Sequence, residues 1–297
     1  MKNQYYLLAF ILAFYGCQSD RSDLPITMAP AEIAETPPVD VATAPRVQQM
    51  DEKQVVGCYV GDFKNVETSP KSESIPSNRI TLIIDDFQNG TVKGRSIVAG
   101  NSRPFIGSYT VTNEGYQAEV QEPGDDPYDG KFLFLVNDSM FPLRGEWHAN
   151  RADLKGRHKR YGLQKKEFVY DPALALPDRL GGIYLGNDDP DYEEDAPGEY
   201  STEDVLTVNP SAQRLTNSDV ENMYKADLEI LRNSIYARHG YSFKNKRIRY
   251  VFDQNVDWYI PVSTDVRAEL TQLEVANIDL IKRYEEHADR YYDTFGR

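Results

Sequence analysis

The chain has 297 residues, of which 40% are hydrophobic and 11% aromatic, enough apolar surface for packed cores, and this excludes a chain that is disordered throughout. It carries 47 acidic against 33 basic residues, a formal net charge of -14, which argues against a nucleic acid or an anionic membrane surface as the main partner. The two cysteines, Cys17 and Cys58, provide no disulfide framework.

Residues 1–16 have the pattern of an export signal. One early lysine precedes a short apolar run, and Gly16 stands at the expected cleavage point directly before Cys17. The run is too short to span a bilayer. This arrangement resembles a bacterial lipoprotein signal of the looser Bacteroidetes type, because Phe14 and Tyr15 replace the leucine and small residue of the strict pattern. The resemblance implies a lipid on Cys17 and a lipid-anchored protein of the cell outer membrane or periplasm; a plain secretory signal is the alternative.

Residues 17–50 are expected to form a disordered tether. The segment is rich in Pro, Ala, Thr and Ser and contains no aromatic residue, so it cannot bury a core. It would hold the folded domains away from the membrane.

A β-rich domain is predicted over residues 51–170. Apolar and polar residues alternate with a period of two in short runs, separated by turn pairs such as Asn89-Gly90. Short turns favour an antiparallel meander, and its closure into an eight-strand barrel would remove the sheet edges. The expected strands lie at 59–63, 80–84, 91–98, 105–112, 116–120, 131–136, 143–147 and 161–164.

The first of these strands lies within GCYVGDF at 57–63. Cys58 in this stretch is interpreted as a small buried thiol. Together with LRGEWHA at 143–149, this start resembles lipocalin-like barrels, which implies an interior that holds a small apolar ligand. A barrel filled by its own side chains is the alternative.

The loop 122–130 is acidic, with carboxylates at Glu122, Asp125, Asp126 and Asp129. Pro127 and Val136 stand where an EF-hand would need oxygen ligands, so that type of site is excluded. A calcium site of another kind and a loop built on Asx turns are the two interpretations.

Residues 171–213 are predicted to be a connector. Nine acidic residues within 188–204 predict a solvated linker. The piece GGIYLGNDD at 181–189 echoes the first strand, and it is expected to pair with that strand or to cap the barrel.

Residues 214–290 are predicted to form a small bundle of three helices. Ser218 and Glu221 form a capping-box pair that would start a helix running from about 219 to 239, with Gly240 as its left-handed C-cap. A second helix is expected over 246–252, and Thr271 with Glu274 would cap the third. The overall fold class is therefore α+β, a barrel-like antiparallel domain followed by helices.

The words LRNSIYARHGYSF, VFDQNVDWYIP and LTQLEVANIDLIKRYEE in this region resemble the YARHG domain, a small bacterial extracellular module. Its five-letter motif stands at Tyr236, Ala237, Arg238, His239 and Gly240. Arg232 and Arg238 are each expected to pair with a carboxylate, Asn233 to bond to the backbone, and His239 to interact with the helix dipole. The motif is interpreted as a capped helix end with a buried ion pair in preference to a binding site.

One basic cluster follows the motif, with Lys244, Lys246, Arg247 and Arg249. It would bind an anionic envelope polymer, or it would pair with the acidic connector; the sequence supports both readings equally.

No catalytic, cofactor-binding or metal-ligating residue is predicted, because the four histidines show no metal-ligand spacing and no catalytic motif stands in the sequence. The expected function is a non-enzymatic, lipid-anchored envelope protein whose YARHG module contacts cell-wall or outer-membrane components. A lipocalin-like carrier of a small apolar ligand is the alternative, and a peptidoglycan-active hydrolase is a third hypothesis.

Overall fold

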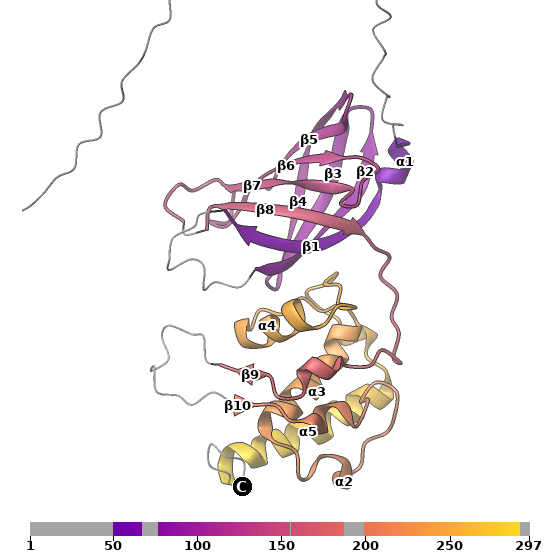
Figure 1. Ribbon diagram of the computed structural model, residues 1–297, viewed down its shortest axis with the longest axis vertical. Helices are drawn as coiled ribbons and strands as arrows, with labels where there is room; N and C mark the ends of the chain where they lie inside the picture. The colour runs from indigo at the N-terminus through magenta and orange to yellow at the C-terminus, as the bar shows by residue number, and fades with distance from the viewer. Residues whose placement is uncertain (1–49, 67–76, 155, 187–198, 292–297) are drawn as a thin grey trace, which may run out of the picture. The chain divides into compact units, whose positions relative to one another are not determined.

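The computed structural model describes residues 50–66, 77–154, 156–186 and 199–291 (Figure 1). The predicted signal segment, Cys17 and nearly all of the tether lie outside these residues. No helix in the described ranges combines the length and apolar character needed to cross a membrane.

Eight antiparallel strands close into a barrel, because each pairs with the next in sequence and the last pairs with the first (Figure 1). This confirms the predicted α+β fold with its eight-strand barrel. The strands are β1 (Gly57–Asn65), β2 (Asn78–Gln88), β3 (Thr91–Val98), β4 (Asn101–Thr112), β5 (Gly115–Gln121), β6 (Gly130–Val136), β7 (Leu143–Ala149) and β8 (His158–Lys165).

The alternation in the sequence matches the two faces of the strands. In β6, Phe132, Phe134 and Val136 are buried while Leu133 between them is exposed. The turn between β2 and β3 has positive φ at both Asn89 (52°) and Gly90 (76°), as a two-residue type I′ hairpin requires.

The barrel interior is filled by side chains. Aromatic rings meet in two groups, one around Phe63, Phe132, Trp147 and Tyr161 with ring centroids 5.7 to 6.4 Å apart, and one made by Phe87, Tyr109 and Tyr116. All belong to one continuous buried core. The packing therefore favours the filled barrel over the ligand-holding barrel.

The short helix α1 (Glu52–Val55) packs against β2 at one end of the barrel (Figure 1). Val55 is fully buried in the barrel core, and its carbonyl accepts a 2.7 Å hydrogen bond from the Tyr59 hydroxyl. Asp51 caps this helix in a capping box with Gln54. Cys58 lies partly buried in β1, and burial raises the pKa of its thiol to about 11, so it is protonated at neutral pH.

The C-terminal region is helical and has its own core, built around Leu231, Phe252, Tyr259 and Ile281. Its elements are η1 (Asp178–Leu180), β9 (Tyr184–Leu185), β10 (Glu199–Tyr200), η2 (Glu203–Leu206), α2 (Asn217–Val220), α3 (Lys225–Arg238), α4 (Lys246–Asn255), η3 (Arg267–Glu269) and α5 (Gln272–Tyr291). The helix predicted at 246–252 and the Thr271–Glu274 capping box of α5 are both present.

Two local predictions are wrong. The single helix expected from about 219 to 239 is two helices, α2 and α3. The capping box of α2 is formed by Thr216 and Asp219 instead of Ser218 and Glu221, and Glu221 is the C-cap of α2. The segment that echoes the first strand does not pair with it. Its strand β9 pairs with β10 instead, since β1 is already flanked by β2 and β8.

Part of the predicted connector also belongs to the folded helical region. Leu180, Leu185 and Val205 are almost completely buried in the helical core. The apolar positions that flank the acidic run therefore belong to the helical core, and most of the predicted linker, residues 187–198, lies outside the described residues.

Candidate functional site

The five-residue motif 236–240 ends helix α3. Gly240 has a positive φ of 72°, its N–H donates to the Ala237 carbonyl at 2.9 Å, and the Tyr241 N–H donates to the Tyr236 carbonyl at 3.0 Å. This pair of bonds is the Schellman motif that closes helices ending in glycine. A Cβ at Gly240 would lie 2.5 Å from the Val262 side chain, so only glycine fits there.

His239 forms part of a buried polar network at this helix end. Its Nε2 lies 2.8 Å from Oε2 of Glu274, and the two side chains are 5% and 0% exposed. Glu274 also accepts hydrogen bonds from the Thr271 N–H at 2.9 Å and from the Tyr170 hydroxyl at 3.1 Å, while the Tyr170 ring stacks on His239 at 4.2 Å. Burial alone raises the pKa of Glu274, but the bonds from Thr271 and His239 outweigh it and hold this pKa below its ordinary value.

Arg238 is almost completely buried and bonds to neutral groups. Its Nε and Nη2 donate to the Leu174 carbonyl at 3.0 and 2.8 Å, Nη1 donates to the Ser234 hydroxyl at 2.7 Å, and the guanidinium lies over the Trp258 ring. The expected carboxylate partner is therefore wrong for Arg238, whose pKa burial lowers to about 10. Arg232 does pair with a carboxylate, that of Glu285 at 2.8 Å.

The other motif side chains also pack inside the helical region. Ala237 is buried in the core, the Tyr236 ring contacts Tyr241, and the Asn233 side chain donates to the Glu229 carbonyl one turn earlier in α3. This geometry agrees with the predicted capped helix end, with a buried His239–Glu274 hydrogen bond in place of the expected ion pair of Arg238.

The four residues of the basic cluster do not form one free surface. Arg247 pairs with Glu199 at 3.2 Å and with Glu229 at 2.9 Å, and Arg249 donates to the Lys244 carbonyl at 2.7 Å. Glu199 is part of the acidic run, so the pairing reading has one direct contact in its favour. Lys244 and Lys246 are exposed.

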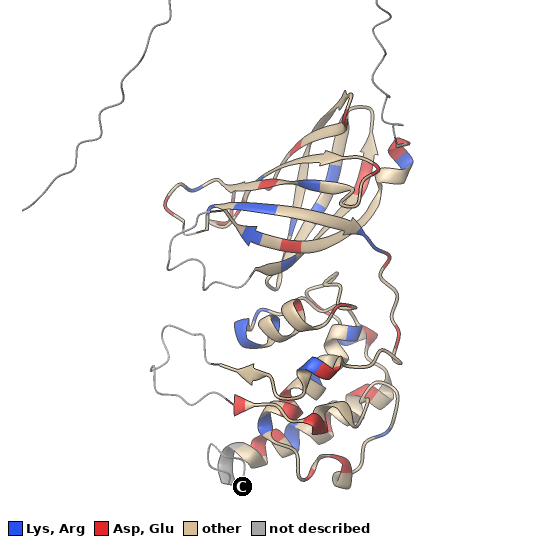
Figure 2. Cartoon of the chain, viewed as in Figure 1, with Lys and Arg blue, Asp and Glu red and all other residues tan. Residues whose placement is uncertain are grey.

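A groove of about 1360 Å³ runs along the outer face of the barrel, over β5 to β8 and β1. Amide side chains, charges of both signs and one partly exposed ring line it, among them Asn65, Asn113, Gln117, Gln164, Arg144 and Phe141. Several of the charges pair locally, as Lys64 does with Asp62 at 3.1 Å and Arg160 with Glu146 at 3.1 Å. Figure 2 shows both signs of charge on the barrel strands and on the helices.

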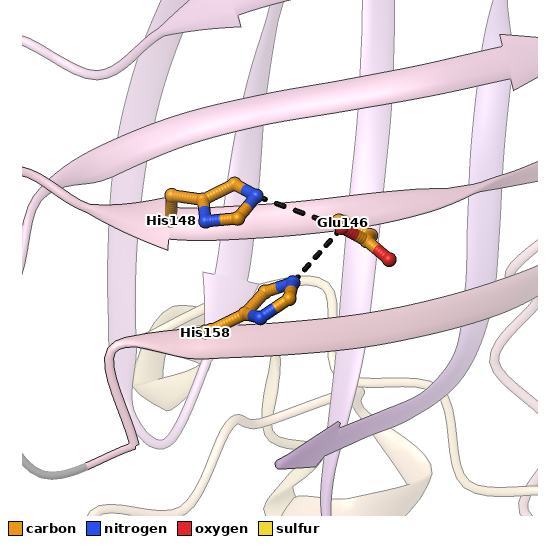
Figure 3. Close-up of side chains that lie close together, drawn as sticks. All are labelled: Glu146, His148 and His158. Carbon is orange, nitrogen blue, oxygen red and sulfur yellow. Dashed lines mark hydrogen bonds and ion pairs between the residues drawn. The ribbon is translucent and has the colours of Figure 1, made fainter. Parts of the chain in front are cut away.

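Beside this groove, two histidines converge on one carboxylate (Figure 3). Glu146 and His148 lie on one face of β7, and His158 is the cross-strand partner of His148 on β8. Nε2 of His158 and Nε2 of His148 lie 2.9 and 3.6 Å from Oε2 of Glu146, and the two imidazole rings stack at 4.2 Å. Hydrogen bonds from His158 and Arg160 hold the pKa of Glu146 below its ordinary value.

The sequence prediction missed this cluster. Glu146 and His148 share a face because they are two apart in a strand, but His158 joins them only through the register of the β7–β8 hairpin. The spacing of the histidines along the sequence therefore did not reveal that this pair converges. The signal that could have found them was the hairpin itself, with a histidine near the end of one strand and another at the start of the next.

Three of the four carboxylates of the acidic loop 122–130, those of Glu122, Asp126 and Asp129, bond to neighbouring groups of the barrel domain. Glu122 accepts from the Ser96 hydroxyl at 2.7 Å, Arg103 pairs with Asp126 at 3.2 Å and with Asp129 at 2.9 Å, and Asp126 accepts from the Tyr128 N–H in an Asx turn. This geometry agrees with the Asx-turn interpretation of the loop.

Comparison with protein-family models finds one match, the YARHG domain, over residues 203–286. No curated protein and no solved structure matches the chain significantly. The matched span begins at η2, runs through the capped end of α3, and includes the buried His239–Glu274 pair. The C-terminal helical region of this chain, residues 203–286, is a YARHG domain.

Proposed function

We propose that the chain is a lipid-anchored, non-enzymatic protein of the bacterial cell envelope that binds a polar glycan of the cell wall or outer membrane. The YARHG domain is typical of extracytoplasmic proteins, and the Gly16-Cys17 pattern of the signal segment supports a lipid on Cys17. The tether would let the folded part reach a polymer beyond the membrane surface.

The observation that carries the binding role is the groove on the outer face of the barrel. Its amide side chains offer both donors and acceptors, and an exposed face of Phe141 offers an apolar surface. Ion pairs neutralise several of its charges, and the whole chain has a net charge of -14, so a polyanion would be repelled. A neutral, hydroxyl-rich chain fits these side chains best.

The YARHG domain, in this proposal, supports the protein without contacting the polymer through its motif. The motif side chains are committed to the helix cap and to buried bonds, and Arg247 is held by two glutamates. The carrier alternative needs room inside the barrel, and the packed aromatic interior weighs against it. Native mass spectrometry of the purified protein distinguishes the two, because a carrier would retain a lipid or small metabolite.

Sedimentation of the full-length protein with isolated cell wall tests the proposal. Gln117 and Gln164 are exposed amides in the groove, so the double variant Gln117→Ala/Gln164→Ala should fold normally and pellet several-fold less than wild type. The matched control, Gln213→Ala/Gln272→Ala, removes exposed amides from the helical region and should pellet like wild type. Equal pelleting of both variants would remove the groove from the proposal, and clearing of peptidoglycan in a zymogram would contradict the non-enzymatic role.

A further inference from the structure

We propose that Glu146, His148 and His158 form a binding site for one divalent transition-metal ion, with zinc as the expected ion. The inference does not require the glycan proposal, although Glu146 also lines the outer groove, since it rests on three side chains that converge on one point (Figure 3). One ligand atom from each residue lies within 4.8 Å of the other two.

The distances suit a single ion. Tetrahedral zinc with bonds of about 2.0 to 2.1 Å separates its ligand atoms by about 3.3 Å. The two distances from the histidine nitrogens to Oε2 of Glu146 are 2.9 and 3.6 Å and bracket that spacing. Binding would also require the two imidazole rings, which stack at 4.2 Å with an interplanar angle of 19°, to turn so that a nitrogen lone pair of each points at the ion.

The chemistry of the ligand set also fits. Two imidazoles with one carboxylate are the ligands that zinc, nickel and copper prefer, whereas calcium and magnesium prefer oxygen alone. The side chains are 27% to 44% exposed, so an ion can enter from solvent, and its remaining coordination positions would hold water.

The surrounding charges define the binding mode. Arg160 donates to Oε1 of Glu146 at 3.1 Å, which leaves Oε2 to bind the ion. Lys131 is the cross-strand neighbour of His148 on β6, but its ammonium group pairs with Glu119 at 2.6 Å. Arg160 is thus the cation that opposes metal binding most directly, and it makes the affinity of the site tunable.

The strands hold the ligands rigidly. His148 and His158 are paired residues of an antiparallel ladder, and Trp147 between the two β7 ligands is anchored in the barrel core. The register of the hairpin therefore fixes the backbones of all three ligands side by side before an ion arrives.

Zinc titration of the full-length protein, purified with a tag that contains no histidine, tests the proposal. Calorimetry at pH 7.5 should give one zinc ion per chain, and the cobalt-substituted protein should show visible d–d absorption. His148→Ala and His158→Ala should each weaken binding at least tenfold, whereas His287→Ala, which removes an exposed histidine from α5, should leave it unchanged. Arg160→Ala should strengthen binding several-fold.

Glu146→Gln tests whether weaker zinc binding could come from misfolding, because the isosteric amide keeps hydrogen-bonding capacity while it removes the charge of the ligand. It should weaken zinc binding with an unchanged circular dichroism spectrum. An absence of stoichiometric binding in wild type, or binding that survives the double variant His148→Ala/His158→Ala, would overturn the proposal.

Discussion

Removal of the Glu274 side chain should destabilise the YARHG domain far more than removal of an exposed glutamate from the same helix. Glu274 is fully buried and joins the start of α5 to the end of α3, since it accepts bonds from Thr271, Tyr170 and His239. Glu274→Ala leaves these donors without their acceptor. Each buried donor left unsatisfied costs about 1 to 3 kcal/mol of unfolding free energy.

Glu274→Gln should cost less, about 1 to 2 kcal/mol, because the amide oxygen can still accept from Thr271. The pKa of Glu274 in the folded protein lies below its ordinary value of 4.5, so the ionised side chain contributes stability above that pH and the contribution is lost as the pH falls through the folded value. The stability gap between wild type and Glu274→Gln should therefore narrow as the pH is lowered from about 6 to 3.

The assay is urea unfolding followed by tryptophan fluorescence. The chain has two tryptophans, Trp147 in the barrel and Trp258 in the helical region, so a Trp147→Phe background leaves a single reporter of the YARHG domain. Glu286→Ala on the exposed side of α5 is the matched control and should change the stability by less than about 0.5 kcal/mol. A Glu274→Ala loss no larger than that of the control would refute the role given to the His239–Glu274 pair.

Three further outcomes follow from the described contacts. Gly240→Ala should cost more unfolding free energy than Gly182→Ala in the same fluorescence assay, because both positions have positive φ but only at Gly240 would a Cβ collide with neighbouring atoms; equal costs would contradict the steric argument. Burial raises the pKa of Glu122, so its ionisation opposes folding as the pH rises from about 4 through the folded value, and the stability of Glu122→Gln should increase relative to wild type over that range. Trp147 reports the unfolding of the barrel in a Trp258→Phe background. A stability difference that does not vary with pH would contradict this prediction. Millimolar calcium should leave the thermal midpoint unchanged, because Arg103 already pairs with Asp126 and Asp129, and an upward shift would restore the calcium interpretation of the loop.

The barrel was predictable because its information is local. Strict alternation, as in β6, and turn pairs such as Asn89-Gly90 set each strand and its connection, and a chain of short hairpins leaves few ways to close the sheet. The end of α3 was predictable for the same reason, since a glycine after an apolar helical stripe marks the left-handed cap.

Contacts that depend on tertiary position were not predictable. Arg238 was expected to pair with a carboxylate, but its partner is the backbone carbonyl of Leu174, which lies 64 residues earlier in the chain. His148 and His158 become neighbours only through strand register, and α2 separates from α3 because Thr216 and Asp219 form a capping box of their own. The connector was predicted to be a linker from its charge alone, whereas its leucines, Leu180 and Leu185, are buried in the helical core.

The outer groove of the barrel is proposed to bind a neutral glycan. Calorimetric titration of the full-length protein with soluble cell-wall glycan fragments tests it most directly, with three proteins compared: wild type, the groove variant Gln117→Ala/Gln164→Ala, and Lys246→Glu in the basic cluster. Wild type should bind the fragments saturably, the groove variant should lose this binding, and Lys246→Glu should retain it. Binding that Lys246→Glu abolishes and the groove variant keeps would contradict it.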